Sequence, residues 1–86
     1  MGKQNEALKL AIKDELLGKF RGVGAGEGAL VPTGWLYDEF LPSLDRKEEQ
    51  ALEETVAEMI REGIIEYLPG AKPTYRLTKK GADLLC

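Results

Sequence analysis

The spacing of the apolar residues changes at Gly63, and this change limits the fold more than any other feature of the sequence. Before it, the stretch 46–62 carries apolar residues at helical intervals, namely Leu52, Val56, Met59 and Ile60. After it, Ile64–Leu68 and Thr74–Thr78 are rich in β-branched and aromatic residues, and they enclose the turn sequence Pro69–Pro73. A chain of 86 residues is short for more than one core. We therefore predict a single α+β domain in which a β-hairpin follows a helix.

A long first helix is predicted over 4–20, because apolar residues recur there at every fourth position: Leu8, Ile12, Leu16 and Phe20. This row should face the core. Leu10 and Leu17 fall on the far side of the same helix. Either the C-terminal segment covers them, or they pack against a second subunit, and they are our candidate contacts of a homodimer.

A glycine-rich loop, 22–28, should end this helix, because glycine loses the most backbone entropy on ordering. Its glycine spacing is similar to that of a dinucleotide-binding loop, but such a loop follows a strand, and this one follows a helix. A flexible connector is the better interpretation. Ala29–Leu30–Val31 can then form a short edge strand that ends at Pro32.

A short second helix is predicted from Gly34 to Leu41, with Thr33 as its cap and Pro42 ending it. It contains Trp35, the only tryptophan, which we expect to pack in the core, although it could also anchor a binding surface.

A third helix should begin at Arg46, because Asp45 and Glu48 have the spacing of a capping box, and Gly63 should end it. Thr78 can cap a last short helix over Lys79–Leu85, whose Leu84 and Leu85 could cover the core.

The composition excludes several kinds of site. Without histidine, the chain lacks the central group of Ser/His/Asp and Cys/His arrangements. Its one cysteine, Cys86, permits neither an intrachain disulfide nor a cysteine metal cluster. Adjacent carboxylates such as Glu53 and Glu54 diverge on a helix and do not form an acid/base pair. We expect no catalytic residues, metal or cofactor. No apolar run suits a membrane span or a secretory signal, so we expect a cytoplasmic protein.

The predicted order of elements is that of a winged-helix domain. The residues Met59–Ile65 and the pattern Y-x-L-T-x-x-G-x-x-L from Tyr75 to Leu84 resemble the C-terminal part of regulators of the MarR, PadR and ArsR kinds. The resemblance covers about half of the chain. It implies a small winged-helix domain over residues 1–86, with three helices, a β-hairpin wing and a short C-terminal helix. It also implies that the helix 46–62 is the recognition helix, which enters the major groove of DNA in DNA-binding members.

The charge is divided unevenly along the chain. Residues 45–62 carry seven acids and three bases, a balance of −4, whereas residues 63–86 carry +2, and the whole chain carries −3. Glu54 and Glu58 should lie at the centre of any groove contact, where carboxylates oppose phosphate. The candidate DNA contacts are Lys47, Gln50 and Arg61 on the helix, and Lys72, Arg76, Lys79 and Lys80 on the wing side.

Two functions remain open. The first is a DNA-binding transcriptional regulator that contacts double-stranded DNA through the wing and the third helix. The second is a protein-interaction module of the same fold that binds a protein partner through its acidic third helix.

Overall fold

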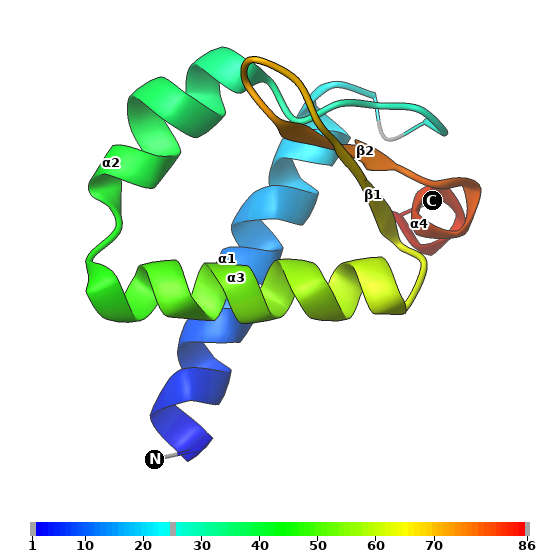
Figure 1. Ribbon diagram of the computed structural model, residues 1–86. Coiled ribbons are helices and arrows are strands. Elements are labelled where there is room, and N and C mark those ends of the chain that lie inside the picture. Colours follow the sequence, from blue (N-terminus) through cyan, green and yellow to red (C-terminus); the bar gives the residue numbers. More distant parts are fainter. Residues whose placement is uncertain (1, 25, 86) are drawn as a thin grey trace.

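The structure, a computed structural model, describes residues 2–24 and 26–85, and of residues 2–5 only the backbone. Cys86 lies outside the described residues. The elements are α1 (Gly2–Gly22), η1 (Trp35–Phe40), α2 (Leu41–Ser43), α3 (Arg46–Arg61), β1 (Ile65–Leu68), β2 (Thr74–Leu77) and α4 (Lys79–Leu85) (Figure 1). Helices and one antiparallel hairpin share a single core, so the predicted α+β class is confirmed.

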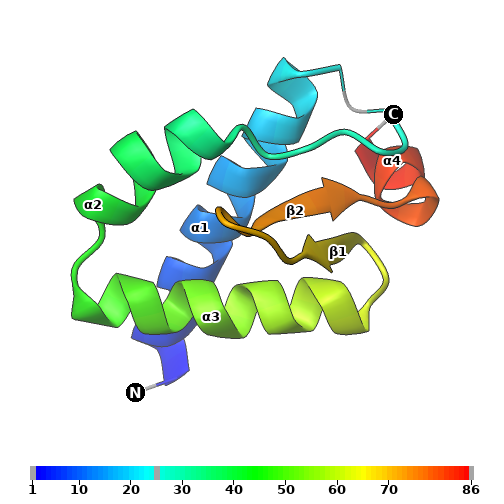
Figure 2. The same ribbon diagram turned by 45° about the horizontal axis from the view of Figure 1, so that its top comes forward.

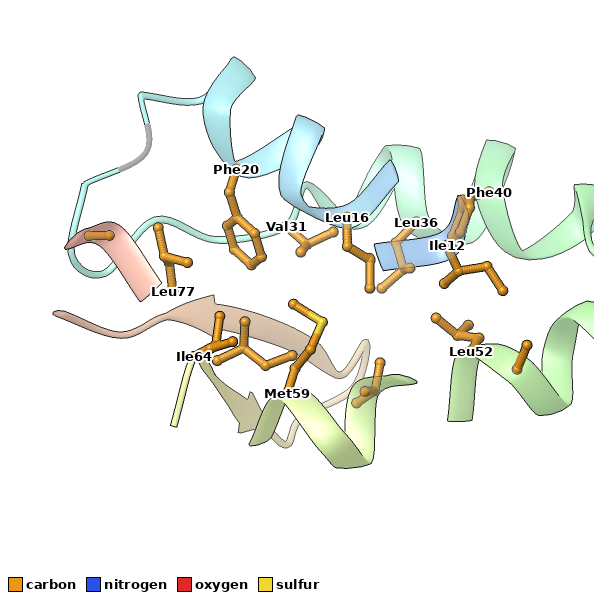
Figure 3. Packing of buried hydrophobic residues seen from close by; sticks show 14 residues of the cluster. Ile12, Leu16, Phe20, Val31, Leu36, Phe40, Leu52, Met59, Ile64 and Leu77 are labelled. Atoms are coloured by element: carbon orange, nitrogen blue, oxygen red, sulfur yellow. The ribbon is translucent and has the colours of Figure 1, made fainter. Parts of the chain in front are cut away.

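The core lies where α1 crosses α3 and meets the hairpin. Ile12, Leu16 and Phe20 of α1 are buried, as predicted from their spacing, and Leu8 packs at the edge of the cluster. Figure 3 shows the side chains of Ile12, Leu16 and Phe20 pointing toward those of α3 and the hairpin, including Met59. Burying one such side chain contributes about 1.5–3 kcal/mol, so this row fixes how α1 sits on the rest of the domain.

The second helical segment is longer than predicted and runs without a break from 33 to 43. Thr33 lies inside its first turn and is not the cap, because the carbonyl of Pro32 already accepts from Leu36 N at 3.0 Å. Pro42 does not end the helix either. A π-helical turn, η1, precedes it, and Leu41 N donates to Leu36 O, five residues back. This wider turn accommodates the proline ring, which would clash with the carbonyl four residues earlier in a regular α-helix.

Both ends of α3 lie where the sequence predicts them. Glu48 N donates to Asp45 Oδ1 at 2.8 Å and Asp45 N donates to Glu48 Oε1 at 3.0 Å, which confirms the capping box. At the other end Gly63 has a φ of +76°, and Ile64 N reaches back to Met59 O at 2.9 Å. This is a Schellman motif. It favours glycine at position 63, because the residue that ends the helix has a left-handed backbone conformation, which glycine adopts without steric strain.

The buried face of α3 is rotated from the predicted stripe. Ala51 and Thr55 are buried beside Leu52, Val56 and Met59, whereas Ile60, which the stripe included, is 39% exposed. The reason is the crossing with α1: small side chains allow the two helices to approach, and Thr55 Oγ1 donates to the carbonyl of Lys9.

The hairpin has the predicted five-residue tip, and each strand is one residue shorter than predicted, because β1 begins at Ile65 and β2 ends at Leu77. Ile65 pairs with Leu77 and Leu68 with Thr74, which leaves residues 69–73 in the turn. It lies along α3, with its tip toward helix 33–43 (Figure 2). Residues 28–31 run beside the outer edge of β2, with Leu77 N donating to Ala29 O at 2.8 Å and Val31 N donating to Tyr75 O at 3.0 Å. The short edge strand predicted at 29–31 is therefore present as an isolated bridge.

The last helix, α4, packs its backbone directly on the hairpin. Thr78 caps it as predicted, accepting from Gly81 N at 3.0 Å. Gly81 and Ala82 are buried, Leu85 packs at the edge of the core, and Leu84 is exposed, contrary to the prediction that it covers the core. The close approach at Gly81 explains this difference, because it turns the small residues of α4 inward.

Candidate nucleic-acid interface

The candidate residues on α3 are all exposed, on the side away from its buried stripe. Lys47 and Gln50 lie in its first turns and Arg61 is its last residue. At a rise of about 1.5 Å per residue, Lys47 and Arg61 are separated by about 21 Å along the helix. The row is therefore long and thinly charged, with Glu54 between its ends.

The side chain of Glu58, expected on the outer face of α3, is 45% exposed there and is paired with a lysine of α1. The ammonium group of Lys9 donates to Glu58 Oε2, and the Lys9 side chain is only 14% exposed. This hydrogen bond lowers the pKa of Glu58 and raises the pKa of Lys9. One of the two acids expected at the centre of a groove contact is thus ion-paired with a lysine of the same chain.

Two of the four cations on the hairpin and α4 also have partners within the fold. Arg76 Nε donates to Glu66 Oε2 at 2.9 Å, across the hairpin from the directly opposite position. Lys80 Nζ donates to the carbonyl of Glu62 at 2.7 Å. A cation at this end of α3 is favoured because the helix dipole is negative there.

Lys72 and Lys79 are exposed at opposite ends of the hairpin. Lys72 lies in the tip, and Lys79 is the first residue of α4, after Thr78, so the four-residue strand β2, about 13 Å long, lies between them. The seven candidate residues therefore form separate groups. Lys47 and Gln50 lie at the start of α3, and Lys80 lies beside its end near Arg61. Lys79 begins α4, Arg76 lies in β2, and Lys72 lies at the tip.

The candidate dimer residues on α1 differ in exposure. Leu10 is 62% exposed, whereas Leu17 is half-buried and packs against the core of its own chain. Of these two leucines, only Leu10 is exposed enough to contact a second subunit.

The structure contains a groove that the sequence does not predict. It has a volume of about 320 Å³ and lies between α1, helix 33–43 and the start of α3. Trp35 lines it, half-buried, with its ring stacked on that of Phe40 at 4.6 Å and the ammonium group of Lys19 over its face. Trp35 thus both packs on the core, as predicted, and lines a surface. Residues 8, 11, 12 and 15 of α1 form one wall of the groove. Their helical spacing was the only signal for it in the sequence, which does not show which helix forms the opposite wall.

The described residues, 2–24 and 26–85, were searched for a cluster of metal ligands and for a membrane-spanning helix. Their acidic side chains form no group of three or more that could hold a metal ion. None of the helices in these ranges combines the length and apolar character that crossing a bilayer requires.

Comparison with protein families, curated proteins and solved structures gives no match for this chain.

Proposed function

We propose that the chain is a winged-helix DNA-binding module of a transcriptional regulator, with α3 as its recognition helix and the hairpin as its wing. The observation that carries this proposal is the exposed row Lys47, Gln50 and Arg61 on α3, beside which the charge of Glu58 is paired with that of Lys9. The pairing of residues 28–31 with β2 supports it, because it joins the start of helix 33–43 to the hairpin.

In this proposal the charged ends of α3 contact the DNA backbone. Lys47 and Arg61 supply cations to phosphates on the two sides of the major groove, and Gln50 can pair with adenine. Lys72 approaches a flanking phosphate from the hairpin tip. Arg76 and Lys80 contribute less, because Glu66 and the carbonyl of Glu62 already occupy them.

The charges also set the strength of the interaction. The chain carries −3 overall, and few cations face the duplex. Each neutralised phosphate contributes about −0.9 to the slope of log affinity against log salt concentration. We therefore expect weak binding of non-specific duplex that disappears as salt is added.

The test is fluorescence anisotropy of a labelled random-sequence duplex over a series of salt concentrations. The variant carrying Lys47→Ala and Arg61→Ala should lose at least tenfold in affinity at low salt, and its salt slope should fall by about 2. Arg21→Ala is the matched control: it removes an exposed cation at the end of α1, on the side of the domain away from α3 (Figure 1). The proposal is refuted if the wild-type chain shows no duplex binding at low salt, or if the control loses as much affinity per charge as the double variant.

The exposed acids of α3 favour a second candidate function, a protein-interaction module. Glu49 and Glu53 are exposed in the N-terminal half of the helix, where no basic residue follows Lys47 before Arg61. A module of this kind would bind a cationic polypeptide such as polylysine and no duplex. The variant with Glu49→Gln and Glu53→Gln would then bind polylysine more weakly than the wild type.

A further inference from the structure

The groove beside Trp35 has walls whose residue spacing suits the packing of a helix. Leu8, Ala11, Ile12 and Glu15 line it from α1 at positions i, i+3, i+4 and i+7. Residues at these intervals form one face of a helix, over about two turns or 10 Å. Trp35, Phe40 and Leu44 line the opposite wall.

The apolar floor of the groove is already in place. Ile12 and Phe40 belong to the buried core, and the ring of Trp35 is held between Phe40 and the ammonium group of Lys19. Leu8 and Leu44 pack at the edge of the core and remain partly exposed. A ligand would therefore cover apolar surface without first having to order these residues, and this lowers the entropic cost of binding.

The polar residues that line the groove are acidic. Glu15, Glu39 and Glu48 carry carboxylates around the apolar floor, and no lysine or arginine is among the described lining residues. Glu48 accepts a hydrogen bond from Asp45 N, but its second oxygen is not engaged in the capping box. Carboxylates around an apolar floor complement an occupant that is apolar on one side and cationic along its edges.

We propose that this groove docks a short cationic amphipathic helix of a partner protein. The occupant presents two or three apolar side chains to Trp35 and Leu8, and lysine or arginine to Glu15 and Glu39. A second copy of this chain is a poorer occupant, because both copies carry −3 and repel each other. The three carboxylates oppose the phosphates of nucleic acid. The groove adjoins the proposed DNA-binding face at the start of α3, where Glu48 lines the groove and Lys47 belongs to the DNA-contact row.

The test uses Trp35 as its reporter, because it is the only tryptophan of the chain and lines the groove. The probe is a leucine/lysine peptide of about 14 residues, long enough for about four helical turns, with leucines at i, i+3, i+4 and i+7. Titrating it should shift the Trp35 emission saturably, and calorimetry should give one binding site. A peptide with glutamate in place of every lysine should produce no shift.

Substitutions separate docking from general charge attraction. The variant with Glu15→Lys and Glu39→Lys should bind the cationic peptide about tenfold more weakly, because each exposed charge contributes modestly and the two act together. The control, Glu53→Lys with Glu62→Lys, makes the same change in net charge at exposed positions that do not line the groove, and it should stay within about twofold of the wild type. Ala11→Gln leaves every carboxylate in place but fills the groove, and it should also weaken binding.

Several results would overturn the proposal. They are the absence of a saturable shift, equal binding of the anionic peptide, an equal loss in the charge control, and full binding by Ala11→Gln. A Trp35 emission that changes with protein concentration when no peptide is present would instead assign the groove to a second copy of the chain. The Lys47→Ala/Arg61→Ala variant should bind the peptide normally, so a failure of the DNA proposal and a failure of this one are distinguishable.

Discussion

Adding one methyl group at Gly81 should separate α4 from the hairpin. A Cβ atom at this position would lie 2.3 Å from the carbonyl oxygen of Ile64 and 2.7 Å from Cδ1 of Leu77. The leucine methyl can rotate away, but the Ile64 oxygen is backbone and already accepts from Thr78 N at 3.1 Å and from its hydroxyl at 2.9 Å. Alanine therefore fits only if α4 moves outward and strains these hydrogen bonds.

The size of the effect follows from two costs and one gain in free energy. Overpacking of this kind costs about 1–3 kcal/mol, and each strained hydrogen bond adds about 0.5–1.5 kcal/mol. The higher helix propensity of alanine returns at most about 1 kcal/mol. We expect Gly81→Ala to lower the free energy of unfolding by about 2 kcal/mol, which lowers the Tm of a domain of this size by about 8–16 °C.

The measurement is urea unfolding followed by far-ultraviolet circular dichroism and by Trp35 emission. Gly18→Ala is the matched control, because Gly18 lies inside α1, is exposed and has no atom within 4 Å of its added Cβ. That variant should be more stable than the wild type by about 0.5–1 kcal/mol. If Gly81→Ala unfolds at the same urea concentration as the wild type, the close packing of α4 on Ile64 is refuted.

Two further expectations concern α3. Asp45→Ala removes the acceptor of Glu48 N and should lower the free energy of unfolding, measured in urea, by about 1 kcal/mol. The control is Asp14→Ala, because Asp14 is exposed on α1 and its loss should change the free energy of unfolding little. An equal effect at both positions would show that the capping box does not stabilise the helix. Glu58→Gln should destabilise the domain near neutral pH and much less in acid. Its partner Lys9 lowers the pKa of Glu58 from the ordinary 4.5, so the contribution is complete above 4.5 and is lost as the pH falls through the lower folded value. At the alkaline end it is lost as the pH rises through the raised pKa of Lys9, above 10.5, and a difference between variant and wild type that does not change with pH would contradict the Lys9 contact.

Local signals in the sequence were sufficient for the ends of α3, the hairpin and the start of α4. The Asp45 capping box, the left-handed Gly63 and the Thr78 cap each depend on residues within a few positions of one another. The turn 69–73 fixes the register of its strands for the same reason.

Features that depend on distant parts of the chain could not be predicted in this way. The rotation of α3 that exposes Ile60 follows from the crossing with α1. The passage of the second helix through Pro42 requires a widened turn, which no local pattern indicates. At the candidate interface the exposure of Lys47 and Arg61 agreed with helical periodicity, but the capture of Glu58 by Lys9 joins residues 49 positions apart.

The hairpin tip is tied to the domain at two points. Tyr37 donates its hydroxyl hydrogen to the carbonyl of Pro73, and Thr74 Oγ1 donates to Val31 O at 2.8 Å. Ordering the backbone of one residue costs about 1–2 kcal/mol in conformational entropy. Because these contacts form when the chain folds, the base of the tip is already restrained before a ligand binds at Lys72. The affinity of such a ligand should therefore change little when the hairpin turn is made stiffer.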